Sequence, residues 1–138
     1  MNTPVDIAAR TAWGEARGEG SQGMQAVLNV VHNRVAQPGW WGRDVISVCT
    51  APAQFSCWRH QDPNREKLLN VTAENPQFHE ALLLAFQMEL GQLPDLTDGA
   101  DHYFDRRTAP PVWACGRFYR KTIGHHAFYH IGLKGEGS

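Results

Sequence analysis

The sequence predicts one α+β domain that is mostly α-helical, with a small extended or β region at its C-terminal end. The chain has 138 residues, of which 42% are hydrophobic and 20% are charged, and this composition suits a single core. Apolar residues recur at helical spacing over much of the chain before Pro94. After Pro94 the chain becomes rich in aromatic and turn-forming residues, which is typical of short strands. We therefore treat residues 1–138 as one domain.

The N-terminal part of the chain predicts two helices separated by glycines. Thr3, followed by a proline, forms a start signal for a helix over residues 5–17, and Gly18 ends it. A second helix, capped by Ser21, carries apolar residues at positions i, i+3, i+4, i+7 and i+11. These residues are Met24, Val27, Leu28, Val31 and Val35. This pattern is the clearest amphipathic helix in the sequence and predicts a place in the core.

The remaining elements are predicted from caps, prolines and glycines. Residues 44–49 are short and apolar, so they fit either a turn of helix or a strand. Residues 51–64 contain two prolines and many polar groups, which predicts a loop. Asn75 precedes a proline and begins another helix, which Gly91 ends. Extended segments are predicted over residues 100–104, 111–114 and 118–131, with Gly124 as a turn or bulge.

Charge and hydropathy exclude several classes of protein. The formal net charge is -1, which is unlike a strongly basic nucleic-acid binder. No apolar run approaches the ~20 residues that a membrane span requires. The first ten residues include Asp6 and Arg10 and have no apolar core, so we expect a protein made in the cytoplasm without a secretory signal. The three cysteines are interpreted as reduced thiols, although Cys49 and Cys57 are close enough in sequence to bridge.

Glu15 is the first candidate for chemistry. It lies near the C-terminal end of an apolar helix, between a tryptophan and several small residues. Desolvation and the negative end of the helix dipole both favour the protonated form of a carboxyl group. A protonated acid is what general acid catalysis on a glycosidic oxygen needs. Small Gly14 and Gly18 would let a polymer approach the backbone. The alternative is a glycine-rich helix end with ordinary surface carboxylates.

Two further segments carry polar and aromatic groups together. Residues 54–58 (Gln-Phe-Ser-Cys-Trp) offer an amide, a hydroxyl and aromatic rings, a mixture that suits sugars. A loop anchored by its aromatic residues is the alternative. The C-terminal part holds several histidines, and His126 and His130 have the i, i+4 spacing of metal ligands on a helix. Because Gly124 and the aromatic density favour extended chain and the sequence has no His-Glu-x-x-His motif, we predict no metal and no cofactor.

Taken together, these segments resemble the SleB-type cell wall hydrolase family, which includes spore cortex-lytic enzymes. The resemblance runs from about residue 8 to residue 130. The segments that carry it are Ala12-Trp13-Gly14-Glu15-Ala16-Arg17-Gly18-Glu19, Gly23, Ala26-Val27, Asn33-Arg34-Val35, Val45-Ile46, Gln54-Phe55-Ser56, Gly99-Ala100-Asp101-His102-Tyr103, Trp113 and Ile123-Gly124-His125-His126-Ala127-Phe128-Tyr129. Any one of these segments alone is a weak signal, whereas their order along the chain is specific.

The resemblance implies a lysozyme-like fold of the lytic transglycosylase kind. It also implies cleavage of the β-1,4 bond between N-acetylmuramic acid and N-acetylglucosamine in the glycan strands of peptidoglycan. The family's catalytic glutamate falls on Glu15 and its second glutamate on Glu19, to which we assign a supporting role. Other motif positions expected to line the groove fall on Gln54, Phe55, Tyr103 and His125. His102, which precedes Tyr103, departs from many relatives.

The reaction product depends on whether a second carboxylate faces Glu15. Glu19 and the distant Asp101 are the candidates, and without an assured partner we expect a lytic transglycosylase that forms 1,6-anhydro ends. A hydrolytic muramidase, a catalytically silent glycan-binding module and a histidine-metal amidase are the alternatives. With no wall-binding repeat and no export signal, the sequence fits a monomeric phage endolysin that acts on the host cell wall.

Overall fold

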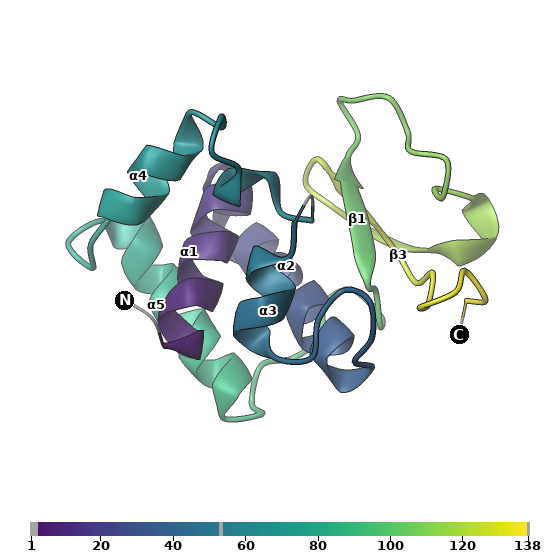
Figure 1. Ribbon diagram of the computed structural model, residues 1–138, viewed down its shortest axis with the longest axis horizontal. Coiled ribbons are helices and arrows are strands. Elements are labelled where there is room, and N and C mark those ends of the chain that lie inside the picture. The colour runs from purple at the N-terminus through teal and green to yellow at the C-terminus, as the bar shows by residue number, and fades with distance from the viewer. Residues whose placement is uncertain (1–2, 53, 138) are drawn as a thin grey trace.

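The computed structural model describes residues 3–52 and 54–137 and places the helices in one lobe beside a small sheet (Figure 1). The α-helices are α1 (Pro4–Ala16), α2 (Gly20–Ala36), α3 (Val45–Thr50), α4 (Asn64–Asn70) and α5 (Pro76–Glu89). The strands are β1 (His102–Asp105), β2 (Tyr119–Ile123) and β3 (His126–Tyr129). Three short 3-10 helices are η1 (Arg17–Glu19), η2 (Ser56–Trp58) and η3 (Gly116–Phe118). In this part of the chain, no helix is long and apolar enough to cross a bilayer.

Helix α1 begins and ends close to the predicted positions. The Thr3 side chain accepts a hydrogen bond from the Asp6 N–H at 3.1 Å, which confirms the predicted cap. The predicted cap of α2 at Ser21 is wrong, because η1 runs directly into a helix that starts at Gly20. The Ser21 hydroxyl instead donates to Glu80 on α5 at 3.0 Å. It therefore joins two helices rather than satisfying the first turn of one.

The structure settles the ambiguous segments of the middle and C-terminal parts. Residues 45–50 form a helix, because the Asp44 side chain and Ser47 make a reciprocal capping box. The predicted loop over residues 51–64 contains η2, and α4 follows it without having been predicted. Helix α4 is short, lacks a side-chain cap and buries Leu68 alone, so its sequence carries little signal. The predicted extended segment over residues 111–114 is mainly turn and coil.

Helix α1 lies at the centre of the helical lobe, in contact with α2, α3, α4 and α5 (Figure 1). Its buried face carries small residues, Ala8, Ala9 and Ala12, all with no exposed surface. Small side chains allow neighbouring helices to approach closely, and larger residues such as Trp41 and Phe78 fill the space around them. The position of α1, including its C-terminal end, is therefore determined by the core.

The sheet has the order β1-β3-β2, and both pairs of strands are antiparallel. Gly124, with φ of 58°, turns the chain between β2 and β3, as predicted. The inner face packs on α2 through Phe128, whereas the outer face, with Ala127 and Tyr129, is covered by the segment around Trp113. The sheet therefore has its own small core and presents β1 to the helical lobe.

Candidate active site

A polar cavity of about 370 Å³ lies between the C-terminal end of α1, the segment around η2 and strand β1. Its walls come from segments that are far apart in the sequence and that the fold brings together. The residues that line it are Gly14, Glu15, Arg34, Gln54, Phe55, Ser56, Cys57, Asp62, Asn64, Tyr103, Phe104, Asp105 and His126. Several polar side chains converge on one concave surface, which is the usual character of a site for a polar ligand.

The Glu15 carboxylate is held at this cavity by three donors. The Tyr103 hydroxyl donates to Oε1 at 2.5 Å. The Cys57 backbone N–H donates to Oε2 at 3.1 Å, and the Ser56 hydroxyl donates to the same oxygen at 3.4 Å. The Cys57 N–H is available because the first N–H groups of a helix, here η2, have no partner within that helix. Both carboxylate oxygens are therefore fixed by groups more than 40 positions away along the chain.

Gly14 allows this arrangement through close packing. A Cβ atom at position 14 would lie 2.9 Å from Cys57 Cβ and 3.0 Å from Leu68 Cδ1. A glycine at this position therefore lets η2 and α4 approach α1 closely enough for the Cys57 N–H to reach Glu15. Gly14 and Gly18 were both predicted to give a polymer access to the backbone. For Gly14 this is wrong, because it packs against protein. The space beside Gly18 is open, since a Cβ there would meet nothing within 4 Å, and its prediction stands untested.

Two titratable side chains beside Glu15, the Tyr103 hydroxyl and the Cys57 thiol, are kept protonated by burial. Burial and the nearby Glu15 charge raise the pKa of Tyr103 well above its ordinary value, so its hydroxyl is a permanent donor to the carboxylate. Burial, with the Glu15 charge as the second cause, also raises the pKa of the Cys57 thiol far above its usual range. Because the thiolate is the nucleophilic form, Cys57 is unsuited to nucleophilic catalysis.

Arg34 forms a buried part of the cavity wall and was not predicted as a site residue. It is 5% exposed, and its guanidinium lies 5.5 Å from the ring centroids of both Trp41 and Phe55. Its Nε donates to the Asp101 carbonyl at 2.8 Å and its Nη1 to Gln54 Oε1 at 3.1 Å. The sequence did contain a signal, because Arg34 falls on the apolar face of the α2 pattern, three residues after Val31.

The structure brings four of the six predicted site residues together at the cavity: Glu15, Gln54, Phe55 and Tyr103. The other two, Glu19 and His125, do not line it and pair with each other. Glu19 accepts hydrogen bonds from the His125 backbone N–H at 2.5 Å and from its ring Nδ1 at 2.9 Å. These hydrogen bonds, the side-chain one first, lower the pKa of Glu19. The neighbouring His126 lines the cavity instead, with its ring centroid 4.9 Å from that of Tyr103.

Neither carboxylate suggested as a partner for Glu15 lies in the cavity. Glu19 is occupied by His125, and Asp101 is buried, with its carboxylate accepting the backbone N–H groups of Ile131 and Gly132 at 2.8 and 2.9 Å. The carboxylates that do line the cavity belong to Asp62 and Asp105. Hydrogen bonds from the Arg107 side chain hold the pKa of Asp105 well below its usual range, so that carboxylate is ionised and paired.

The histidines do not gather into a metal site. Within residues 3–52 and 54–137, no three His, Cys, Asp or Glu side chains lie close enough together to hold a metal ion. The i, i+4 pair His126 and His130 lies on extended chain, where four residues span about 13 Å. His130 bonds the Gly99 carbonyl through Nδ1 at 2.7 Å, whereas no described residue bonds the buried His126 Nδ1.

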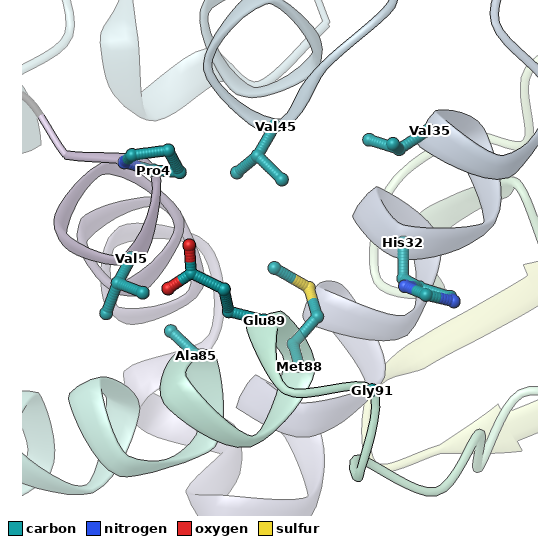
Figure 2. A pocket seen from close by; sticks show the side chains of 9 residues that line it. All are labelled: Pro4, Val5, His32, Val35, Val45, Ala85, Met88, Glu89 and Gly91. Atoms are coloured by element: carbon teal, nitrogen blue, oxygen red, sulfur yellow. The ribbon is translucent and has the colours of Figure 1, made fainter.

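A second cavity, of about 270 Å³, lies beside Pro4 and Val5 at the other, N-terminal end of α1 (Figure 2). It is mostly apolar, and Figure 2 shows the Met88 side chain reaching into it while the His32 ring turns away. Its titratable residues are His32 and Glu89, and no hydrogen bond joins them. It therefore lacks the convergent polar groups that surround Glu15, and the polar cavity is the candidate active site.

Comparison with known proteins assigns the chain to a family. The family model described as Cell Wall Hydrolase matches residues 18–129, so the chain belongs to the cell wall hydrolase family. The chain is 32% identical over 127 residues to the spore cortex-lytic enzyme of Bacillus subtilis (strain 168), an alignment that covers 92% of this chain. The chain spans 37% of the length of that relative.

Two solved structures share the fold. The catalytic domain of the germination-specific lytic transglycosylase SleB from Bacillus anthracis matches with a TM-score of 0.70 and 28% identity, covering 94% of this chain and 95% of that one. The catalytic domain of the Bacillus cereus SleB protein matches with a TM-score of 0.68 and 26% identity, covering 91% and 88%. These findings confirm the predicted SleB-type family and the mostly α, lysozyme-like fold.

Proposed function

We propose that this chain is a peptidoglycan-cleaving glycosidase that acts on the β-1,4 bond between N-acetylmuramic acid and N-acetylglucosamine, with Glu15 as the general acid and base. The observation that carries the proposal is the Glu15 carboxylate, which three donors hold at a polar cavity. Membership of the cell wall hydrolase family supports the substrate class. The family match covers residues 18–129 and does not include Glu15, whose role is supported by its position at the cavity and its three donors.

The proposed reaction uses the substrate as its own nucleophile. Glu15 protonates the oxygen that leaves C1 of the muramic acid residue, and the glycosidic bond breaks. The resulting carboxylate then takes the proton of the C6 hydroxyl, whose oxygen bonds to C1 and closes a 1,6-anhydro ring. No water enters the product. The Tyr103 and Cys57 donors hold the Glu15 carboxyl group in one orientation, and they stabilise the carboxylate that acts as the base in the second step.

The surroundings of Glu15 favour transglycosylation over hydrolysis. A hydrolase of the usual kind uses a second carboxylate as a nucleophile or to activate water. Asp105 is engaged with Arg107 by hydrogen bonds of 2.6 to 3.2 Å, and one Asp62 oxygen accepts the Asn64 N–H at 2.8 Å. The name of the B. anthracis relative, a lytic transglycosylase, agrees with this choice. We further propose that the domain acts on wall glycan as a monomer without a cofactor.

Mass spectrometry of digested peptidoglycan tests the proposal. Purified wall treated with the protein should release soluble fragments with anhydro ends, each one water lighter than the hydrolysed equivalent. Glu15→Gln should lower the rate by about 10²–10⁴-fold, since glutamine cannot transfer the proton, while Glu66→Gln on the exposed face of α4 should not.

Three other outcomes would contradict parts of this proposal. Reducing muramic acid ends alone would indicate hydrolysis, and Asp62 and Asp105 would then be the first candidates for the second carboxylate. Binding to the wall without release of fragments would indicate a silent glycan-binding module. A Glu15→Gln protein that still lyses walls at the normal rate would remove Glu15 from the mechanism.

A further inference from the structure

The amide group of Gln54 can face Arg34 only through its oxygen atom. Its Oε1 accepts a hydrogen bond from Arg34 Nη1 at 3.1 Å. A guanidinium only donates hydrogen bonds, so turning the amide over would bring its NH2 group against another donor. The Gln54 NH2 group must therefore face away from Arg34, and within the described chain it has no hydrogen-bond partner.

Arg34 itself is held firmly enough to impose this orientation. Its Nε bonds the Asp101 carbonyl at 2.8 Å, and its guanidinium lies 5.5 Å from the ring centroids of Trp41 and Phe55. Since the residue is only 5% exposed, it has little room to change rotamer. Arg34 thus acts as a positioning residue, and Gln54 presents a fixed N–H donor to the cavity that also contains Glu15.

We infer that the Gln54 NH2 group recognises the carbonyl oxygen of a sugar N-acetyl group, and that the Arg34–Gln54 pair makes the site selective for N-acetylated glycan. This inference rests on the proposed function. The half-buried Gln54 NH2 group is free to donate to a bound ligand in place of water, and the acetamido carbonyl is the strongest neutral acceptor that an N-acetylated sugar carries. A de-N-acetylated sugar carries an ammonium group at neutral pH, which can only donate and is repelled by the Arg34 charge.

Gln54→Glu provides the test, because it exchanges the donor for a second acceptor without changing the length of the side chain. One carboxylate oxygen can still accept from Arg34, while the other faces the cavity and can accept from an ammonium group. The measurement is the rate of fragment release from native peptidoglycan divided by the rate from chemically de-N-acetylated peptidoglycan. We expect this ratio to fall about tenfold in Gln54→Glu, the effect of losing one well-made hydrogen bond to the substrate.

Both rates are measured on the same protein sample. If a variant is partly unfolded, both rates fall by the same factor, and their ratio does not change. Gln54→Met keeps the bulk without any polar group, and it should lose rate on native wall without gaining any on de-N-acetylated wall. Gln87→Glu, which adds the same charge on the exposed face of α5, should keep the wild-type ratio. Arg34→Lys should lower the ratio part of the way, since a single nitrogen cannot reproduce the two separated donors, Nε and Nη1, that hold Asp101 and Gln54.

The failures of the two ideas can be told apart. A wild-type ratio in both Gln54→Glu and Gln54→Met, with the wild-type protein active on native wall, would overturn this inference and leave the proposed function intact. A wild-type protein that releases nothing from either wall would overturn the proposed function and this inference with it.

Discussion

Replacing Tyr103 with phenylalanine removes one oxygen atom and tests how far activity depends on the orientation of Glu15. The Tyr103 ring should stay in place, because it packs against His126 and Phe128 with centroid separations of 4.9 and 5.5 Å. The lost contact is the 2.5 Å hydrogen bond to Glu15 Oε1. Hydrogen bonds to charged groups contribute about 1.5–3 kcal/mol, and each 1.4 kcal/mol corresponds to about tenfold in rate. We expect Tyr103→Phe to lower the rate of wall lysis by about 10- to 100-fold.

The assay is the release of soluble fragments from purified peptidoglycan, together with a thermal melt of each protein. Tyr119→Phe is the matched control, because its hydroxyl bonds Thr122 on the exposed side of β2 rather than any cavity residue. Tyr119→Phe should keep the wild-type rate and melt like the wild type. Tyr103→Phe should unfold in one cooperative transition at a lower temperature, because the lost hydrogen bond also contributes to stability, and its rate is compared at a temperature where it is fully folded. A folded Tyr103→Phe protein with the wild-type rate would refute the argument that this hydroxyl positions Glu15.

Two other substitutions test the supports of the site. The hydrogen bonds from His125 lower the pKa of Glu19 in the folded state, so their stabilisation is present above the ordinary glutamate range and lost as the pH falls through the lowered pKa. Glu19→Gln should therefore reduce the free energy of unfolding at pH 7. In urea melts, the difference between Glu19→Gln and the wild type should disappear in acid. A difference that persists in acid would show that the ionised Glu19 is not the source of this stabilisation. Gly14→Ala should cost about 1–3 kcal/mol of stability and lower activity, because its methyl group would lie 2.9 Å from Cys57 Cβ. Gly18→Ala, whose methyl would meet nothing within 4 Å, is its control, and equal melting of the two variants would contradict the packing argument.

The helices that the sequence predicted well are those with local signals. Helices α1 and α5 begin at a capping residue followed by proline, and α2 carries a long apolar period. The errors arose where tertiary contacts decide. Ser21 has the chemistry of a cap, but η1 continues the chain into α2, and Ser21 bonds Glu80 on another helix. Helix α4 buries Leu68 alone, so it depends on packing against its neighbours and leaves no periodic pattern.

The candidate site was predicted in part, for a comparable reason. Glu15, Gln54 and Tyr103 stand in motif segments that were recognised together, and the structure brings them to one cavity. His125 was predicted to line the cavity, but it belongs to the turn before β3 and bonds Glu19, whereas His126 is the first residue of β3 and lines the cavity. No local signal shows where the turn ends and the strand begins within the His-His pair. Asp62 and Asp105 reach the cavity only through the tertiary fold, so their sequence context gives no indication of it.

The buried Arg34 connects α2 to two walls of the site, the start of β1 and the segment around η2, which explains why a charge is retained at a buried position. It belongs to α2, donates to the carbonyl that precedes β1, and donates to Gln54 beside η2. Burial lowers the pKa of this guanidinium, so the charge is held there at a cost in desolvation, and a hydrophobic residue of similar size would avoid that cost. Only a planar group with several donors can hold both Asp101 and Gln54 while packing between two rings. We therefore attribute Arg34 to the geometry of the cavity rather than to the stability of the core.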